Sequence, residues 1–230
     1  MDSRHGIILL SGGLDSATTA AIARHDEFRL TALTFSYGQR HTVEISFAQR
    51  LAAYFSIERH EIIEIPSGLF TSALISGSKI EIPRNRDIDL NDDIPETYVP
   101  ARNIIFLSYA LAMAESTGAR DIFIGANAVD YSGYPDCRPV FFRAFQEMAR
   151  VGTKAGVMGD NFIIHTPLLD MTKAEIIKRG ISLGMDYSLT HSCYNPSEDG
   201  SSCGECDSCL IRIKGFRDAG VTDPTRYRRG

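Results

Sequence analysis

The sequence predicts an α/β fold: a doubly wound, mostly parallel sheet of five strands, followed by a cysteine-rich tail. Three observations support this prediction. Short apolar runs alternate with helical patterns, a glycine turn joins the first strand to the first helix, and four cysteines cluster between residues 193 and 209. Alternating strands and helices are typical of parallel sheets, whose ligands bind at the carboxyl ends of the strands.

Five apolar runs are expected to form the strands, each bounded by turn residues. They cover residues 7–10, 30–35, 61–65, 121–125 and 162–167. Helical spacing predicts helices that begin near residues 14, 43, 101, 140 and 172. The side chains expected on their buried faces include Val43, Phe47, Leu51, Tyr54, Ile104, Leu107, Ala110, Leu111, Ala114, Phe141, Phe145 and Met148.

The segment 11–16, SGGLDS, joins the first strand to the first helix. Backbone N–H groups of such a turn, together with the helix dipole, form an anion site. The hydroxyls of Ser11 and Ser16 can donate to phosphate oxygens, and Asp15 suits a bridging Mg²⁺. The lysine of the common phosphate loop is missing. An ordinary turn capped by Asp15 or Ser16 is the alternative.

Two later segments lie at or beyond strand ends. Residues 37–41, YGQRH, follow the second strand and are either part of the site or a polar turn. Residues 127–138, NAVDYSGYPDCR, follow the fourth strand. Their tyrosines can stack on a flat heteroaromatic ligand, and a carboxylate can accept from its ring N–H and amino groups. A solvated loop is the alternative for this second segment.

Thr172 and Glu175 form a capping box that opens the last helix of the sheet domain. Lys173 lies in its first turn, where a cation opposes the helix dipole. We therefore interpret Lys173 as a contact to a phosphate or a carboxylate. An exposed lysine without a role explains the sequence equally well.

Cys193, Cys203, Cys206 and Cys209 have the spacing C-x9-C-x2-C-x2-C, which suits a closed tetrahedral zinc site with a structural role. An iron–sulfur cluster is the alternative, but the x3-C-P continuation of the bacterial ferredoxin run is missing. Cys137 stands apart and is either a packing residue or a nucleophile.

Composition narrows the classes of function. A net charge of −5 argues against a dedicated nucleic-acid binder. No apolar run has the length of a membrane span or follows the pattern of a signal peptide. Reduced, clustered cysteines favour the cytoplasm. We expect a catalytic domain over residues 1–188, whose segment 66–99 is a lid or an oligomer contact, and a zinc-binding tail over residues 189–230 that packs on it.

In chain order, the motifs are SGGLDS, YGQRH, VPARN, DYSGYPDCR, TPLLDMTKAEI and the four-cysteine tail. SGGLDS resembles the pyrophosphate (PP) loop of the N-type ATP pyrophosphatases, which have the adenine nucleotide alpha hydrolase-like fold. The full set, from residue 7 to residue 216, resembles the 7-cyano-7-deazaguanine synthase family of the queuosine pathway. Its members join ammonium to 7-carboxy-7-deazaguanine with ATP and yield a nitrile.

The resemblance implies a ligase that uses ATP, Mg²⁺ and one structural Zn²⁺ per chain, forms a homodimer, and contacts neither nucleic acid nor membrane. It assigns the nucleotide and Mg²⁺ to the glycine turn with Asp15, the charge on the activated oxygen to Arg40 and Lys173, and the deazaguanine to residues of three segments. The nucleotide residues are Ser11, Gly12, Gly13, Leu14, Asp15 and Ser16; the catalytic residues are Asp15, Arg40 and Lys173; the substrate residues are Tyr37, Arg102, Asp130, Tyr131, Tyr134, Asp136 and Arg138. Arg138 is the expected partner of the substrate carboxylate.

Two other functions are alternatives to this one. A related PP-loop enzyme that thiolates tRNA would use Cys137 as a sulfur carrier. A zinc-binding module without catalysis would leave SGGLDS unexplained. Whether ATP is cleaved to AMP or to ADP is open at this point.

Overall fold

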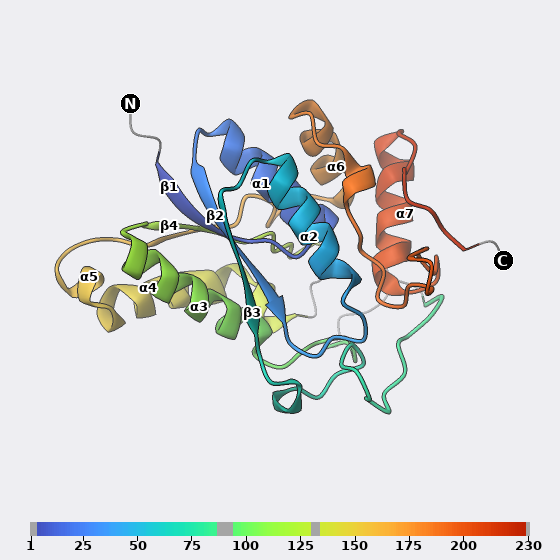
Figure 1. The fold of residues 1–230 in the computed structure, drawn as a ribbon, viewed down its shortest axis with the longest axis horizontal. Helices are drawn as coiled ribbons and strands as arrows, with labels where there is room; N and C mark the ends of the chain where they lie inside the picture. Colours follow the sequence, from blue (N-terminus) through green and yellow to red (C-terminus); the bar gives the residue numbers. More distant parts are fainter. Residues whose placement is uncertain (1–3, 87–93, 130–133, 229–230) are drawn as a thin grey trace.

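The sheet is parallel and doubly wound, as predicted. The computed structural model describes residues 4–86, 94–129 and 134–228. Within them, five strands pair in the order β3-β2-β1-β4-β5. The chain starts at the centre, moves to one edge and then crosses β1 to build the other edge (Figure 1). The strands are β1 (His5–Leu9), β2 (Arg29–Ser36), β3 (Arg59–Glu64), β4 (Asp121–Phe123) and β5 (Ile163–His165).

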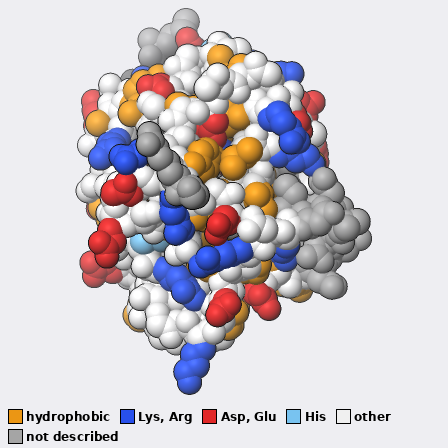
Figure 2. Space-filling model, turned by 90° about the vertical axis from the view of Figure 1, so that its right-hand side faces the viewer, with side chains coloured by type: hydrophobic (Ala, Val, Ile, Leu, Met, Phe, Trp, Pro, Cys, Tyr) orange, Lys and Arg blue, Asp and Glu red, His pale blue; other side chains and the backbone are white. Residues whose placement is uncertain are grey.

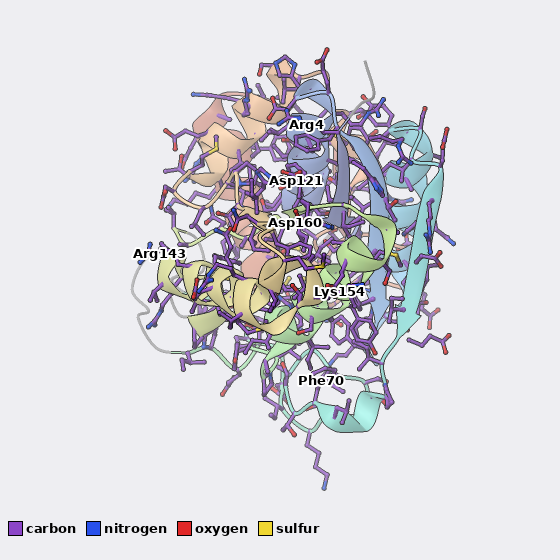
Figure 3. The ribbon with its side chains drawn as sticks, turned by 90° about the vertical axis from the view of Figure 1, so that its left-hand side faces the viewer. Arg4, Phe70, Asp121, Arg143, Lys154 and Asp160 are labelled. Atoms are coloured by element: carbon purple, nitrogen blue, oxygen red, sulfur yellow. The ribbon has the colours of Figure 1, made fainter. Side chains whose placement is uncertain are left out.

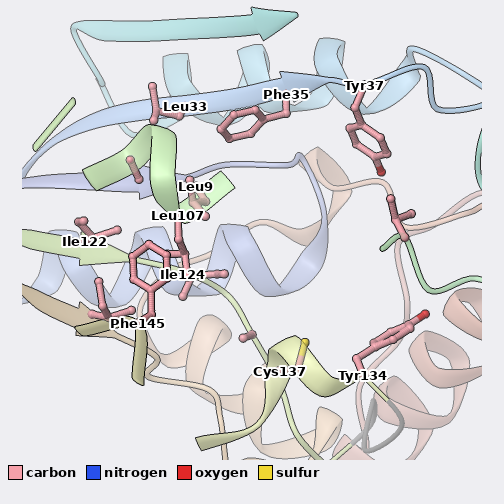
Figure 4. Close-up of a cluster of buried hydrophobic side chains, with 14 of the residues drawn as sticks. Leu9, Leu33, Phe35, Tyr37, Leu107, Ile122, Ile124, Tyr134, Cys137 and Phe145 are labelled. Atoms are coloured by element: carbon pink, nitrogen blue, oxygen red, sulfur yellow. The ribbon is translucent and has the colours of Figure 1, made fainter. Parts of the chain in front are cut away.

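Helices cover both faces of the sheet, because successive strand residues point to opposite sides. Ile7 packs in the core beneath α3 and α4, whereas Ile8 packs in the core beneath α1, α2, α6 and α7. Figure 4 shows part of the first core, where Leu107 and Phe145 approach the strands. The helices are α1 (Leu14–His25), α2 (Val43–Tyr54), α3 (Arg102–Thr117), α4 (Pro139–Gly152), α5 (Lys154–Val157), α6 (Lys173–Ser182) and α7 (Asp207–Ala219), with 3₁₀ turns η1 (Ser67–Leu69), η2 (Pro135–Cys137) and η3 (Tyr187–Leu189).

Three predicted core positions are wrong. Tyr54, Ile104 and Met148 are 44%, 45% and 43% exposed. On α3 the inward position is taken by Asn103, which is held by hydrogen bonds to the η2 turn. On α4 the buried stripe contains Phe142 and not Met148. Adjacent apolar residues leave the phase of a helix ambiguous in the sequence, and long-range contacts decide it.

The segment that follows β3 packs into the first core. Phe70, Leu74 and Ile82 are buried there, and the backbone N–H of Ala73 donates to the Glu96 carbonyl oxygen at 2.9 Å. Figure 3 views the molecule from the side where the strands begin, marked by Arg4 and Asp121; Phe70 lies well away from both. The expectation that 66–99 is a lid or an oligomer contact stays a prediction, and its residues 87–93 lie outside the described ranges.

The C-terminal tail is tied to the rest of the protein. Helix α7 packs against α6, and all four clustered cysteines are buried in the first core. Arg86 reaches across to the tail and binds the Asp207 carboxylate at 2.6 Å. The domain boundary at residue 188 stays a prediction. Among the helices of the described residues, none combines the length and the apolar character that crossing a membrane requires.

Candidate active site and metal centre

The glycine turn is fixed by its contact with α2. Gly12 has a φ of +83°, and a Cβ there would lie 2.5 Å from the Glu44 carbonyl oxygen and 2.8 Å from the Ala48 nitrogen. Only glycine satisfies both the positive φ and this close approach. The Gly12 carbonyl oxygen accepts from the His191 backbone N–H at 2.9 Å, which joins the turn to the C-terminal tail.

Helix α1 begins at this turn without a capping side chain. Gly13 is the N-cap residue, and within the described part of the chain no capping side chain bonds the first N–H groups of the helix. The Ser16 hydroxyl instead donates to the Gly13 carbonyl oxygen at 3.0 Å and lies 3.2 Å from the Ser11 hydroxyl. The alternative of a turn capped by Asp15 or Ser16 is therefore wrong. An open helix N-terminus with two nearby hydroxyls is suited to an anion.

Lys173 and Asp15 form a buried ion pair beside this N-terminus. Their Nζ and Oδ1 atoms are 2.6 Å apart, and Lys173 is only 7% exposed. The predicted carboxylate contact of Lys173 is confirmed, and the alternative of an exposed lysine is wrong. Gly215 of α7 makes room for the lysine, because a Cβ there would lie within 2.4 Å of its Cγ.

One cavity at the carboxyl ends of the strands collects most of the predicted site. It is lined by Ser11, Gly13, Leu14, Asp15, Ser16 and Lys173 around the α1 N-terminus, and by Tyr37, Arg102 and Tyr134 of the predicted substrate set. Tyr37 follows β2 and Tyr134 precedes η2, and both extend beyond the strand ends (Figure 4). Motifs more than a hundred residues apart in the sequence thus meet in one cavity.

Arg40 is not brought to this cavity. Its guanidinium donates to the carbonyl oxygens of Ala73, Ser78 and Ile80, at 2.7, 3.3 and 2.6 Å. It braces the segment after β3. The predicted role of Arg40 on the reacting oxygen therefore has no support in its position.

The loop before α4 contributes less than predicted. Asp136 is buried but does not line the cavity, because its Oδ2 accepts from the Asn103 backbone N–H at 3.0 Å at the start of α3. Arg138 is exposed and lies outside the cavity lining. Asp130 and Tyr131 lie outside the described residues.

Several cavity residues were missed by sequence reasoning. Glu44 in the first turn of α2 lines the cavity, and burial raises its pKa to about 7, although Arg102 opposes the shift. Burial also raises the pKa of Tyr37 to about 12, so the phenol is neutral at physiological pH. Others that line it are Asn103, Asn127, His191, Tyr194, Ser208 and Arg212. Asn103 and Asn127 lie within segments named from the sequence, but without a role of their own. The other residues belong to α2 or to the C-terminal tail, and only the folded chain brings them to the cavity.

Cys137 also lines the cavity, but as an unreactive thiol. Burial and the neighbouring Asp136 raise its pKa to about 12, whereas Arg102 lowers it. Nucleophilic cysteines need the thiolate at working pH. This environment fits the packing alternative better than the nucleophile.

The four clustered cysteines fit a metal ion. Their Sγ atoms all lie within 4.8 Å of one another, and those of Cys203 and Cys209 are 3.9 Å apart. Sulfurs of a tetrahedral Zn–S4 centre are about 3.8 Å apart, given bonds of about 2.3 Å. Backbone N–H groups point at the sulfurs: Cys203 N donates to Cys193 Sγ at 3.1 Å, and Tyr194 N to Cys206 Sγ at 3.4 Å. Such donors stabilise thiolates.

Comparison with known proteins agrees with this arrangement. The family model "Queuosine biosynthesis protein QueC" matches residues 5–220. The chain belongs to the QueC family. It is 55% identical over 222 residues to the 7-cyano-7-deazaguanine synthase of Paramagnetospirillum magneticum, covering 96% of this chain and 97% of that one. It is 54% identical to the enzyme of that name from Cupriavidus necator, covering 98% of both chains.

A solved 4-thiouridine synthetase–RNA complex with bound ATP matches more distantly. It is 15% identical, with a TM-score of 0.49, and the match covers 97% of this chain and 47% of that one. A similarity this weak adds nothing to the assignment, which rests on the QueC family model and the close relatives.

Proposed function

We propose that this QueC family member is a ligase that converts 7-carboxy-7-deazaguanine and ammonium to 7-cyano-7-deazaguanine, with ATP, in queuosine biosynthesis. The observation that carries the proposal is the identity of 55% with an enzyme named for that product, over nearly the whole of both chains. The cavity supports it, because the uncapped N-terminus of α1, the Asp15–Lys173 ion pair and the aromatic side chains of Tyr37 and Tyr134 all line it.

The reaction must overcome a poor leaving group twice. ATP first transfers its adenylyl group to the substrate carboxylate and releases pyrophosphate. Ammonia adds to the activated carbonyl carbon, AMP leaves, and the amide forms. A second ATP adenylylates the amide oxygen and releases pyrophosphate; loss of that oxygen with AMP, and of both amide N–H protons, yields the nitrile. Adenylylation suits a PP loop, and cleavage to ADP and phosphate is the alternative.

The residues around the α1 N-terminus would hold the nucleotide. Backbone N–H groups in the first turn of α1, with the hydroxyls of Ser11 and Ser16, suit the phosphate oxygens. Asp15 provides a carboxylate for Mg²⁺, which would neutralise charge on the phosphates. Lys173 would then stabilise charge that develops on the transferred group.

The opposite end of the cavity would hold the deazaguanine between Tyr37 and Tyr134. Arg102 is the guanidinium in the cavity wall best suited to the substrate carboxylate, since Arg138 lies outside the lining. Burial opposes the charge of Arg102, but Tyr37, Tyr134, Cys137 and Asp136 raise its pKa, so it stays cationic.

The cysteine cluster would hold one structural Zn²⁺ per chain. Its four sulfurs leave no position for a substrate, so its role is to fold the tail. His191 and Arg212, which flank the cluster in the sequence, line the cavity, so the metal would also support the active site. Iron in place of zinc is the alternative that elemental analysis would detect.

The rival functions explain less. A tRNA thiolase with Cys137 as sulfur carrier needs a thiolate, whereas the pKa of Cys137 is raised to about 12. A non-catalytic zinc module leaves the buried Asp15–Lys173 pair without a purpose. On the face shown in Figure 2, Lys and Arg side chains are mixed with Asp and Glu. This face is therefore not the uniformly basic surface that nucleic-acid binding favours. We also propose that the enzyme is a cytoplasmic homodimer.

One assay tests the proposal and its rivals. The protein is incubated with 7-carboxy-7-deazaguanine, ATP, Mg²⁺ and ammonium, and the products are identified by mass. We expect the nitrile, with the amide as intermediate and AMP as the nucleotide product. Absence of both amide and nitrile would contradict the proposal, and ADP in place of AMP would move the cleavage position.

A further inference from the structure

Glu44 is a cavity carboxylate to which none of the described residues donates a hydrogen bond. It belongs to the first turn of α2 and lines the same cavity as Tyr37 and Arg102. Within the described residues, no hydrogen bond or ion pair to its carboxylate is formed; Arg102 acts on it only through space. A partly desolvated carboxylate without donors is costly, and a ligand that supplies donors relieves that cost.

The surroundings of Glu44 restrict the shape of such a ligand. Tyr37, Phe106 and Tyr134 line the same cavity, with the Tyr37 and Phe106 ring centroids 5.6 Å apart. Phe106 in turn stacks on Phe35 at 3.9 Å with an interplanar angle of 5°, which holds its ring in one orientation. Fixed aromatic walls suit a flat ring system.

The charges around Glu44 restrict the chemistry. Of the described residues, the charged and titratable ones that act on it are Arg102 from α3 and Tyr37 from the end of β2. A second cation such as ammonium would be repelled by the neighbouring guanidinium. A neutral group with adjacent N–H donors meets no such repulsion and matches the two oxygens of one carboxylate.

We propose that Glu44 recognises the deazaguanine ring of the substrate by accepting hydrogen bonds from its ring N–H and its exocyclic amino group. This inference rests on the proposed function. Of the loop carboxylates expected for that task, Asp136 is engaged at the start of α3, and Asp130 lies outside the described residues. Glu44 therefore determines specificity for a 2-amino purine-like ring over one that lacks the amino group.

Proton release is a consequence that a purely structural role would not produce. Burial raises the pKa of free Glu44 to about 7, so part of the enzyme carries a protonated carboxyl there at neutral pH. Two N–H donors favour the ionised form, so substrate binding near pH 7 releases a proton. The dissociation constant should rise as pH falls below 7, because protons compete with the ligand.

The test compares two ligands by calorimetry: 7-carboxy-7-deazaguanine and its analogue without the exocyclic amino group. Wild type is measured in two buffers of different ionisation enthalpy, which counts the released protons. Glu44→Gln is the variant, and Glu58→Gln, at an exposed glutamate just after α2, is the matched control. Steady-state KM values for ATP and ammonium are measured in parallel.

For wild type and the control we expect proton release and binding of the analogue about 100-fold weaker than that of the substrate. Glu44→Gln should weaken binding of the substrate about 100-fold and abolish the proton release. The KM values for ATP and ammonium should change by less than about threefold. Similar binding of both ligands to wild type, which needs no variant, would overturn the inference. So would a rise in the ammonium KM alone. If wild type forms no nitrile, the proposed function itself fails.

Discussion

Two helices begin beside the cavity, and only one of them has a side-chain N-cap. Helix α6 is closed by its own side chains: the Thr172 hydroxyl accepts from Glu175 N at 3.3 Å, and Glu175 Oε2 accepts from Thr172 N at 2.8 Å. Helix α1 begins at Gly13 without a capping side chain. Both are long enough to carry a dipole, and only one leaves its N–H groups for a ligand.

The difference suggests that the two neighbouring helix N-termini have different tasks: that of α1 binds a ligand, and that of α6 stabilises the fold. At α1 the open N–H groups are the proposed phosphate site. At α6 the capping box fixes the first turn, so that Lys173 reaches Asp15. A lysine in a first helical turn opposes the dipole, and here the Asp15 carboxylate offsets that cost. Changes at α1 should therefore affect turnover, whereas changes in the α6 cap should affect unfolding.

The largest effect is expected from Asp15→Asn at α1. The amide keeps an acceptor for Lys173 but loses the charge proposed to bind Mg²⁺. We expect kcat to fall about 1000-fold, with the circular dichroism spectrum unchanged. Turnover comparable to wild type in the mass-based assay would show that Asp15 has no role on the metal.

Gly12→Ala should follow, because its Cβ would meet the backbone of α2 at 2.5 Å. We expect turnover to fall about 100-fold as the turn shifts from the phosphate position. The matched control is Gly77→Ala, at a φ of +75° with nothing within 4 Å of the added Cβ. The control variant is destabilised only by the positive φ, which lowers its free energy of unfolding by about 1–2 kcal/mol, and it should keep full activity. Equal losses in the two variants would exclude the steric explanation.

Thr172→Ala tests the closed end. Loss of the cap should lower the free energy of unfolding by about 1 kcal/mol and Tm by about 2–4 °C, with kcat nearly unchanged. Hydrogen bonds from Thr172 lower the pKa of Glu175 in the folded protein. The Glu175 carboxylate therefore stabilises the fold at pH values above its pKa in the unfolded chain, and this stabilisation is lost as the pH falls through its pKa in the folded protein. Calorimetric scans at neutral and acidic pH measure the loss of stability and its dependence on pH. A large fall in kcat with an unchanged Tm would contradict the view that the α6 cap acts on stability and not on turnover.

The smallest effect is expected from Arg138→Ala. Its side chain is exposed and lies off the cavity lining, so kcat/KM for 7-carboxy-7-deazaguanine should stay within about threefold of wild type. A loss of about 100-fold would instead support Arg138, and not Arg102, as the partner of the substrate carboxylate.

The glycine turn was predictable because its information is local. Strand, turn and helix start follow one another within residues 7–16, and a glycine is needed where a side chain would strike a neighbour. The cysteine spacing is equally informative, since four sulfurs can meet one ion only if the chain returns to it. The parallel, doubly wound sheet followed from the alternation of strands and helices, whereas the order of its strands was not predicted.

The substrate end was predicted less well, because chemical type alone does not say which way a side chain faces. Asp136 and Arg138 lie in a polar, loop-like segment, yet one supports α3 and the other is exposed. Glu44 looks like an ordinary acidic residue in a first helical turn. Its place in the cavity depends on α2 packing against Gly12, a contact that no local pattern encodes.

The central claim is that this chain forms a nitrile from ammonium, and isotope labelling tests it most directly. The enzyme is supplied with 7-carboxy-7-deazaguanine, ATP, Mg²⁺ and ammonium that carries heavy nitrogen, and the product is analysed by mass. We predict 7-cyano-7-deazaguanine with the heavy nitrogen in its nitrile group, formed about 1000-fold more slowly by Asp15→Asn. A product without the label, or no product from a folded, metal-loaded wild type, would contradict the account.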